Sequence, residues 1–136
     1  MDKSELIAAA LAARDNSYCP YSGYSVGAAL LTAGGQVFTG CNIENAGYSP
    51  TLCAERSAMA SAVSAGVRDF AMLAVCGGPK DKAPETYFYP CGVCRQWLAE
   101  FCAPDFPVLT AKSADDYQET TLAELLPFAF SPDTLT

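Results

Sequence analysis

The sequence predicts an α/β fold in which a mixed β-sheet carries helices on both faces. Two observations support this prediction: a β-hairpin signal near the N-terminus, and strands that alternate with helices after it. With 136 residues and 51% hydrophobic content, the chain has the size and the apolar material for a single domain over residues 1–136.

Helices are expected where apolar residues recur every three or four positions, and strands where β-branched and aromatic residues lie between turn signals. In chain order these patterns predict a helix over 3–14, strands over 26–32 and 36–41, a helix over 53–66, a strand over 70–76, a helix over 92–101, strands over 107–110 and 117–121, and a short helix over 122–126.

The limits of the first elements follow from local signals. Asp2 is placed to cap the first helix, which ends where Tyr, Pro, Ser and Gly gather over 16–23. The next two strands flank an Ala-Gly-Gly turn at 33–35 that suits a hairpin. A loop over 42–51 is expected to follow this hairpin.

The later elements are limited in the same way. Gly66 closes the helix that starts at Cys53. Prolines, glycines and charged residues over 77–89 predict a surface loop between the next strand and helix, and Pro127 stops the last helix.

Charge and hydropathy disfavour two classes of partner. A net charge of -7 with 8 Lys plus Arg leaves no basic stripe for a phosphate backbone, so nucleic acid is not expected and a small neutral substrate is. No apolar run reaches the length of about 18 residues that a membrane span needs, and the N-terminus lacks a secretory pattern. We therefore expect a soluble, cytoplasmic protein that does not interact with membranes.

Cysteine usage predicts a metal site. The chain has seven cysteines and no histidine, an odd number that argues against a disulfide framework. Cys53, with Glu55 two positions on, and the pair Cys91 and Cys94 offer three thiolates and a carboxylate that is not a ligand, as in a catalytic zinc site with an open position. The other four are expected to be small core residues: Cys19, Cys41, Cys76 and Cys102.

The predicted helices suit this chemistry. Both cysteine groups fall at helix N-termini, where backbone N–H groups and the helix dipole favour thiolates. Three thiolates on a divalent zinc ion give the site a net negative charge. Arg56 and Arg95 are placed to donate hydrogen bonds to the sulfur atoms, which would withdraw part of this charge from them. Glu55 is expected to shuttle protons during hydrolysis of a substrate at this metal.

The motifs resemble the cytidine deaminase family, in its small homotetrameric form, over nearly the whole chain. The segments that carry the resemblance are 21–22, 26–31, 40–46, 53–56, 90–96 and 124–127. The resemblance implies a three-layer α/β/α fold around a central mixed β-sheet. It also implies zinc-dependent hydrolysis of cytidine and 2'-deoxycytidine to uridine and 2'-deoxyuridine, with release of ammonia, in pyrimidine salvage.

The same resemblance implies roles for individual residues. One zinc ion per chain would be bound by Cys53, Cys91 and Cys94, with Glu55 as the proton shuttle. Asn42 and Glu44 would hydrogen-bond the ribose, chiefly at its 3'-hydroxyl, while backbone groups near Ala54 and Tyr89 would contact the base. An aromatic contact with the substrate is implied for Tyr24, and contacts at sites shared between subunits are implied for Tyr48 and Phe130. Taken alone, Phe130 is a candidate for packing that secures the C-terminal tail.

The chain departs from the family pattern near the substrate. Tyr24 replaces a common phenylalanine, Tyr89 stands where serine commonly precedes the proline, and Phe128 fills a position that is often small. The loop over 80–89 is also longer than usual. These changes leave the metal motif intact and affect substrate preference.

Three other functions are compatible with parts of this pattern. A deaminase of blasticidin S or of a modified nucleoside would keep the same metal motif. A structural zinc module would need a fourth ligand, for which Cys41, Cys76 and Cys102 are candidates. A nucleic-acid editing deaminase is disfavoured because the chain is acidic.

Overall fold

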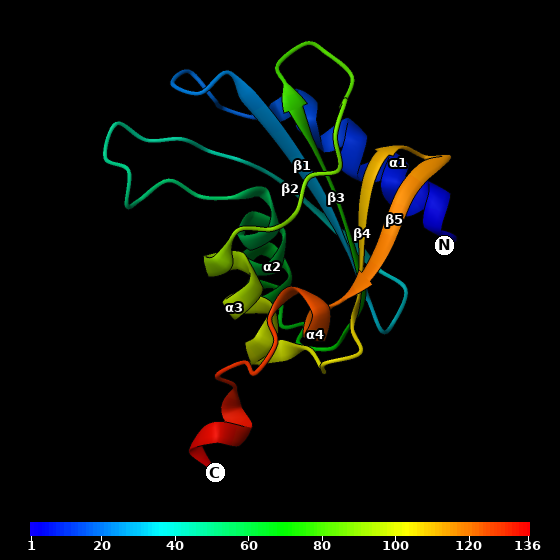
Figure 1. The fold of residues 1–136 in the computed structure, drawn as a ribbon, viewed down its shortest axis with the longest axis vertical. Coiled ribbons are helices and arrows are strands. Elements are labelled where there is room, and N and C mark those ends of the chain that lie inside the picture. Colours follow the sequence, from blue (N-terminus) through cyan, green and yellow to red (C-terminus); the bar gives the residue numbers. More distant parts are fainter.

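The computed structural model describes residues 1–136 and contains a five-stranded sheet with strand order β2-β1-β3-β4-β5 (Figure 1). The strands are β1 Tyr24–Thr32, β2 Val37–Cys41, β3 Phe70–Pro79, β4 Pro107–Ser113 and β5 Asp116–Thr121. Only β3 and β4 pair in parallel, and the other neighbours are antiparallel. The prediction of a mixed sheet is therefore confirmed.

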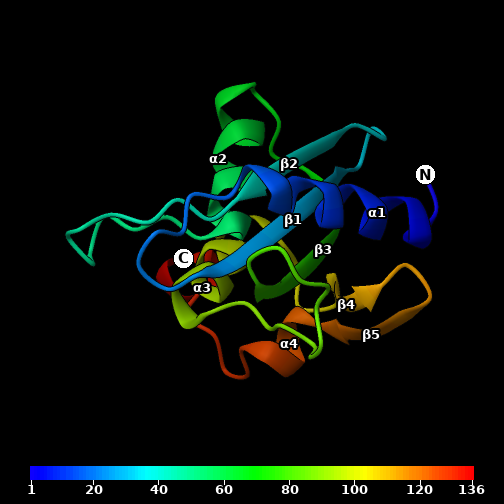
Figure 2. The ribbon, with the colours of Figure 1, turned by 90° about the horizontal axis from the view of Figure 1, so that it is seen from above.

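Helices cover both faces of this sheet. They are α1 Lys3–Ala13, α2 Ala54–Ser64, α3 Gly92–Phe101 and α4 Leu122–Leu125, with 3-10 turns at Arg14–Asn16 and Pro132–Leu135. Helix α1 lies across the sheet from α3 and α4 (Figure 2). None of the helices has the length and apolar character that a bilayer span requires.

The sheet separates two apolar clusters because successive residues of a strand point to opposite faces. In β1, Ala28 and Leu30 face α2, while Ala29 between them faces α1. Helix α1 buries Leu6 and Ile7 in its cluster. A fully buried side chain of this size contributes about 1.5–3 kcal/mol, so the two clusters fix both helical layers to the sheet.

Several predicted elements are confirmed with small shifts at their ends. Asp2 caps α1 by accepting a hydrogen bond from the Glu5 amide at 2.9 Å. The hairpin of β1 and β2 forms as expected, and α3 has the predicted limits. The first helix gives way to a 3-10 turn at Arg14.

The prediction that the loop after β3 starts at residue 77 is wrong. Gly77 and Gly78 continue the strand and pair with Val26 and Ser25 of β1. Glycine, which commonly marks a loop, is needed here for close packing, because a Cβ at Gly77 would lie 2.9 Å from the ring of Phe88. The loop therefore begins after Pro79.

Candidate metal centre

Three cysteine sulfur atoms converge where α2 and α3 begin. Cys53 is the N-cap of α2, Cys91 is the N-cap of α3, and Cys94 lies in the first turn of α3. The Cys53 and Cys91 Sγ atoms are 3.6 Å apart, those of Cys91 and Cys94 are 3.5 Å apart, and all three lie within 4.8 Å of one another. Sulfur ligands on one tetrahedral zinc ion, with Zn–S bonds of about 2.3 Å, stand about 3.8 Å apart. The arrangement therefore fits a single zinc ion.

The helix N-termini prepare these sulfurs for negative charge. Both N-cap positions are cysteines of the cluster and neither makes a side-chain capping bond, so the positive ends of two helix dipoles lie beside the sulfur atoms without a capping oxygen. A hydrogen bond with Cys94 lowers the pKa of Cys53 to about 5, and Arg56 adds to this effect. The pKa of Cys94 is raised because it shares a proton with Cys53 and is buried.

Glu55 is a buried carboxylate beside the cluster. Its side chain is 1% exposed, and neither carboxylate oxygen has a hydrogen-bond partner. Burial raises the pKa of Glu55 to about 7, with a further contribution from the charge of Cys53. A protein keeps such an unpaired group at a cost in stability, and a carboxyl that titrates near neutral pH suits proton transfer.

Arg56 lies next to a sulfur atom, as the sequence predicts. Its Nη2 donates to the Cys53 Sγ at 3.4 Å and to the Thr51 carbonyl oxygen at 3.2 Å. Hydrogen bonds from a cation to a thiolate withdraw charge from the sulfur. The guanidinium can therefore offset part of the negative charge of the three thiolates.

The expected contact between Arg95 and a thiolate is wrong. Arg95 Nε donates to the Pro90 carbonyl oxygen at 2.6 Å, and Nη1 donates to the Leu125 carbonyl oxygen at 2.7 Å. One residue along a helix turns the side chain by about 100°, so Arg95 leaves the face that carries Cys94. It joins the start of α3 to the end of α4 instead.

The two residues expected at the ribose form hydrogen bonds with the start of β1 and with the turn before it. Asn42 is buried, and its Oδ1 accepts from the Val26 amide at 2.9 Å while its Nδ2 donates to the Tyr24 carbonyl oxygen at 2.8 Å. Glu44 Oε1 accepts from the amides of Tyr21 and Ser22 at 3.0 and 3.1 Å. These hydrogen bonds, led by the one from the Ser22 side chain, hold the pKa of Glu44 below its ordinary value.

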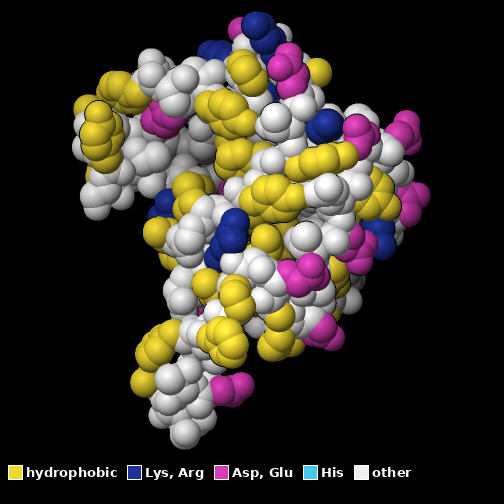
Figure 3. All heavy atoms as spheres, in the orientation of Figure 1, with side chains coloured by type: hydrophobic (Ala, Val, Ile, Leu, Met, Phe, Trp, Pro, Cys, Tyr) yellow, Lys and Arg dark blue, Asp and Glu magenta, His cyan; other side chains and the backbone are white.

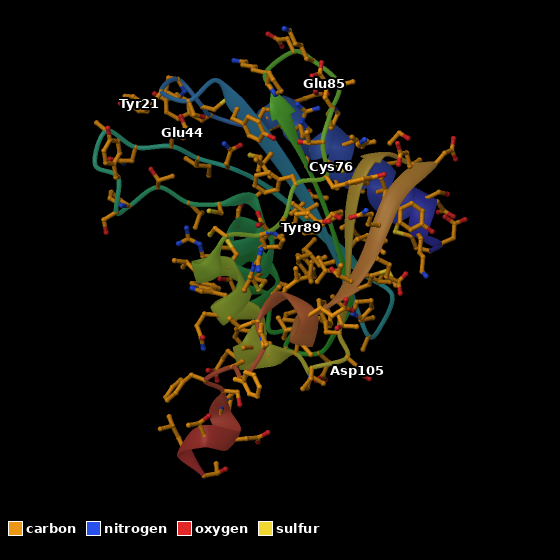
Figure 4. The ribbon with its side chains drawn as sticks, viewed as in Figure 1. Tyr21, Glu44, Cys76, Glu85, Tyr89 and Asp105 are labelled. Atoms are coloured by element: carbon orange, nitrogen blue, oxygen red, sulfur yellow. The ribbon has the colours of Figure 1, made fainter.

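Glu44 also lines a cavity of about 380 Å³ at this end of the sheet. The other lining residues are Tyr21, Ser22, Asn45, Tyr48 and Thr51. Figure 4 shows Tyr21 and Glu44 together there. A carboxylate beside an aromatic ring in an open cavity can accept hydrogen bonds from a sugar.

The remaining expected contacts are spread over the fold. Ala54 is fully buried at the start of α2, and the Tyr24 ring is half-buried with its centroid 5.9 Å from that of Phe88. Tyr48 is 90% exposed on the loop that projects from the sheet (Figure 1). Phe130 is 57% exposed on the C-terminal segment, so its side chain is not part of the core.

The cysteines outside the cluster do not complete it. Cys19 and Cys76 are buried as expected, while Cys41 and Cys102 are half-buried. The cluster of possible metal ligands contains Cys53, Cys91 and Cys94 and no fourth residue. This composition is that of a zinc site with an open position, and it gives the structural-module hypothesis no support.

Sequence reasoning missed a set of contacts next to the cluster. Tyr87 and Tyr89 donate hydrogen bonds to Asp116 and Gln118 of β5. The available signal was the aromatic run at 87–89, which is unusual for a surface loop and directly precedes the second cysteine motif.

Comparison with known proteins agrees with this geometry. Residues 1–110 match the family described as "Cytidine and deoxycytidylate deaminase zinc-binding region". The chain is 49% identical over 135 residues to a cytidine deaminase of Sporosarcina psychrophila. The aligned region covers 99% of this chain and 96% of that one. The crystal structure of a cytidine deaminase from Burkholderia pseudomallei superimposes with a TM-score of 0.87 at 45% identity, covering 96% of this chain and 100% of that one. A blasticidin-S deaminase of Bacillus cereus is 33% identical over 111 residues, covering 79% and 78% of the two chains.

Proposed function

Because the chain belongs to the cytidine and deoxycytidylate deaminase family, we propose that it is a zinc-dependent enzyme that converts cytidine and 2'-deoxycytidine to uridine and 2'-deoxyuridine with release of ammonia. Pyrimidine salvage is the process that uses this reaction. The observation that carries the proposal is the buried, unpartnered carboxylate of Glu55 beside three convergent thiol groups.

Cys53, Cys91 and Cys94 would hold the zinc ion. When bound, zinc supplies Lewis acidity that makes water a stronger acid and a better nucleophile near neutral pH. The helix N-termini favour the thiolate forms that this binding requires. Arg56 limits the excess negative charge through its contact with Cys53.

Glu55 moves protons between water and the substrate. It accepts a proton from the attacking water and delivers it to N3 of the cytosine ring as the water oxygen bonds to C4. It then takes the remaining proton from the new hydroxyl group on C4 and transfers it to the amine. The bond from C4 to this nitrogen breaks, C4 becomes a carbonyl, and ammonia leaves. A pKa of about 7 allows the group to accept and donate at neutral pH, and catalysis of this kind is worth ~10²–10⁴-fold.

Asn42 and Glu44 would recognise the sugar. Each is fixed by bonds to backbone groups, and each keeps hydrogen-bonding capacity: one N–H of the Asn42 amide and lone pairs on the Glu44 carboxylate. Both ribose and 2'-deoxyribose carry a 3'-hydroxyl. A site that reads this group accepts both nucleosides and disfavours the free base.

We also propose that the enzyme assembles as a homotetramer with shared sites. Large apolar side chains are exposed along α3 and the C-terminal segment: Val93, Trp97, Phe128, Phe130 and Leu135. Hydrophobic side chains gather on this part of the surface (Figure 3). Exposed apolar surface of this kind marks an interaction site, and a neighbouring copy would cover it. Sedimentation velocity should therefore give four chains per particle, and a monomer would contradict this assembly.

A deaminase that acts on blasticidin S is the second candidate. The specific observation in its favour is the 33% identity to the Bacillus cereus enzyme. The higher identity to the Sporosarcina psychrophila cytidine deaminase, 49%, favours the nucleoside.

The deciding experiment follows the loss of cytidine absorbance together with ammonia release, using zinc-loaded protein. Parallel reactions contain 2'-deoxycytidine, free cytosine or blasticidin S. Turnover of both nucleosides, with little turnover of cytosine, would support the proposal. Turnover of blasticidin S alone would overturn it in favour of the second candidate.

Two variants test the assigned mechanism. Glu55→Gln should bind zinc normally and lose nearly all turnover, because the proton carrier is gone. Glu5→Gln makes the same change at an exposed position of α1, across the sheet from α3, and should leave turnover at the native rate. Near-normal turnover by the Glu55 variant would exclude this residue as the proton carrier.

A further inference from the structure

The segment that leads into the second cysteine motif is held by side chains. Between the end of β3 and the start of α3 the chain has no regular structure, and residues 83–90 take part in no backbone–backbone hydrogen bond. We call residues 83–90 the strap. A segment without backbone bonds is free to move unless its side chains fix it. The strap ends next to Cys91, so its position bears on that sulfur atom.

Three consecutive aromatic residues of the strap alternate between two directions. The Phe88 ring packs against Gly77 of β3, and its centroid lies 5.9 Å from that of Tyr24. Tyr87 and Tyr89 point the other way, toward β5. This alternation is that of an extended chain, and it ties the strap to two separate parts of the sheet.

The two tyrosines bind two side chains of β5 that lie two positions apart and therefore on the same face of the strand. The Tyr87 hydroxyl donates to Asp116 Oδ1 at 2.5 Å, and the Tyr89 hydroxyl donates to Gln118 Oε1. Lys112 of β4 adds a cationic contact, with its Nζ 4.5 Å from the centroid of the Tyr87 ring. The edge strand β5 is thus the support on which the strap rests.

Tyr89 is the last side-chain anchor before the metal motif. The next residue, Pro90, is buried, and its carbonyl oxygen accepts the 2.6 Å bond from Arg95. The path of the strap back toward α3 passes in front of the sheet at Tyr89 (Figure 4). Tyr89 therefore fixes the chain just before Pro90, and Arg95 fixes the carbonyl group of the peptide that joins Pro90 to Cys91.

We propose that Tyr89 and Gln118 form a positioning pair that holds the Cys91 arm of the metal site, an inference that rests on the zinc site of the proposed function. Cys53 comes from α2 and Cys91 from α3, so the distance between their sulfurs depends on how the two helix starts are held. Metal binding is sensitive to ligand placement on the scale of about 0.5 Å. The hydrogen bond from Tyr89 to Gln118 of β5 limits movement of the strap at a point two residues from Cys91.

The test compares zinc binding by the native protein, Tyr89→Phe, Gln118→Met and the double variant. Each single change removes one partner of the hydrogen bond and keeps the shape of the side chain. We expect each to weaken zinc binding in competition with a chromophoric chelator by about 3- to 10-fold, below the range for a direct partner of a ligand. The double variant should be no weaker than the single variants, because both remove the same contact.

The matched control is Tyr117→Phe. Tyr117 lies on β5 between Asp116 and Gln118, and its hydroxyl makes no hydrogen bond within the chain. This variant should bind zinc as the native protein does. The thermal midpoints of all variants should stay within a few degrees of the native value. In protein loaded with Co²⁺, the thiolate charge-transfer bands should change in the variants of Tyr89 and Gln118 and stay as in the native protein in Tyr117→Phe.

Two results would overturn the positioning pair. One is native zinc affinity in both single variants, and the other is losses that add in the double variant or follow the thermal midpoint. Excess zinc should restore turnover by Tyr89→Phe, and failure to do so would also contradict a role in metal placement. If the native protein itself bound no zinc, the proposed zinc site would be wrong, and this inference would fail with it.

Discussion

Gly40 of β2 lies directly against Ala54, the first residue of α2. A Cβ at position 40 would stand 2.5 Å from the Ala54 carbonyl oxygen, and also 2.5 Å from the Ala58 amide nitrogen. Real Cβ atoms do not approach backbone this closely, so the helix that carries Glu55 rests on bare backbone of the hairpin.

Gly40→Ala should therefore push α2 away from the sheet and disturb the metal site. We expect the free energy of unfolding to fall by about 1–3 kcal/mol, as for other overpacked sites, with weaker zinc binding. Urea unfolding and chelator competition measure the two effects. In the control, Gly34→Ala, the nearest atom to the new Cβ would be 3.9 Å away, so stability should change by less than about 0.5 kcal/mol. Equal stability of the two variants would contradict the packing argument.

Asn42→Asp should lower the free energy of unfolding, whether or not substrate is present. The Asn42 amide bridges the Val26 amide and the Tyr24 carbonyl oxygen, and a carboxylate would lose the second bond and place an acceptor against an acceptor. The cost is about 1–3 kcal/mol in urea unfolding, as for a buried polar group left without its partner.

A control for this change is Asn45→Asp. Asn45 is exposed, and its Oδ1 accepts from the Gly47 amide at 2.9 Å, a bond that aspartate retains. Its stability should match that of the native protein. A similar loss of stability in both variants would mean that the two hydrogen bonds of Asn42 to β1 are not the cause.

The metal ligands could be predicted from sequence because their geometry is local. Cys91 and Cys94 are three positions apart on one helix, and the step from Cys53 to Glu55 lies within one helical start. The caps and the Ala-Gly-Gly hairpin turn are local in the same sense. Each depends on residues within a few positions of one another, so pattern alone was sufficient.

Long-range contacts account for what pattern did not predict. Gly77 looks like a loop residue, and its place in β3 depends on Phe88, which packs against it from the strap. The bond from Tyr89 to Gln118 joins residues 29 positions apart. Arg95 was assigned to a sulfur from its place beside Cys94, whereas its partners are carbonyl groups that the fold brings to it.

Arg95→Met should lower stability through the loss of these two bonds to carbonyl groups. Methionine keeps the apolar length of the side chain and removes both donors, so the Pro90 and Leu125 carbonyl oxygens lose their partner. We expect a loss of about 1–3 kcal/mol in the free energy of unfolding. Arg68→Met is the control, because Arg68 is exposed and donates one bond, to the Val63 carbonyl oxygen at 3.2 Å. Its loss should be below about 0.5 kcal/mol, and a larger loss than in the Arg95 variant would refute the assignment.

Glu55→Gln should reveal the cost of the buried carboxylate as a pH-dependent gain in stability of the metal-free protein. The pKa of Glu55 is raised from 4.5 to about 7, so the folded state holds a proton that the unfolded state has released between these values. The contribution of Glu55 to folding stability therefore falls as pH rises from 4.5 to about 7, and it levels off above that. At one pKa unit per 1.36 kcal/mol, the fall is roughly 3 kcal/mol.

The measurement is urea unfolding of both proteins after zinc removal, at several pH values between 4 and 8. Cys53 is present in both proteins, and its titration cancels to first order in the difference between them. The buried amide of glutamine adds an offset that does not vary with pH, so the change in the difference reports Glu55. A difference that stays flat across this range would mean that the carboxylate is hydrated or paired in solution, and it would then lack the raised pKa that suits it to carry protons at neutral pH.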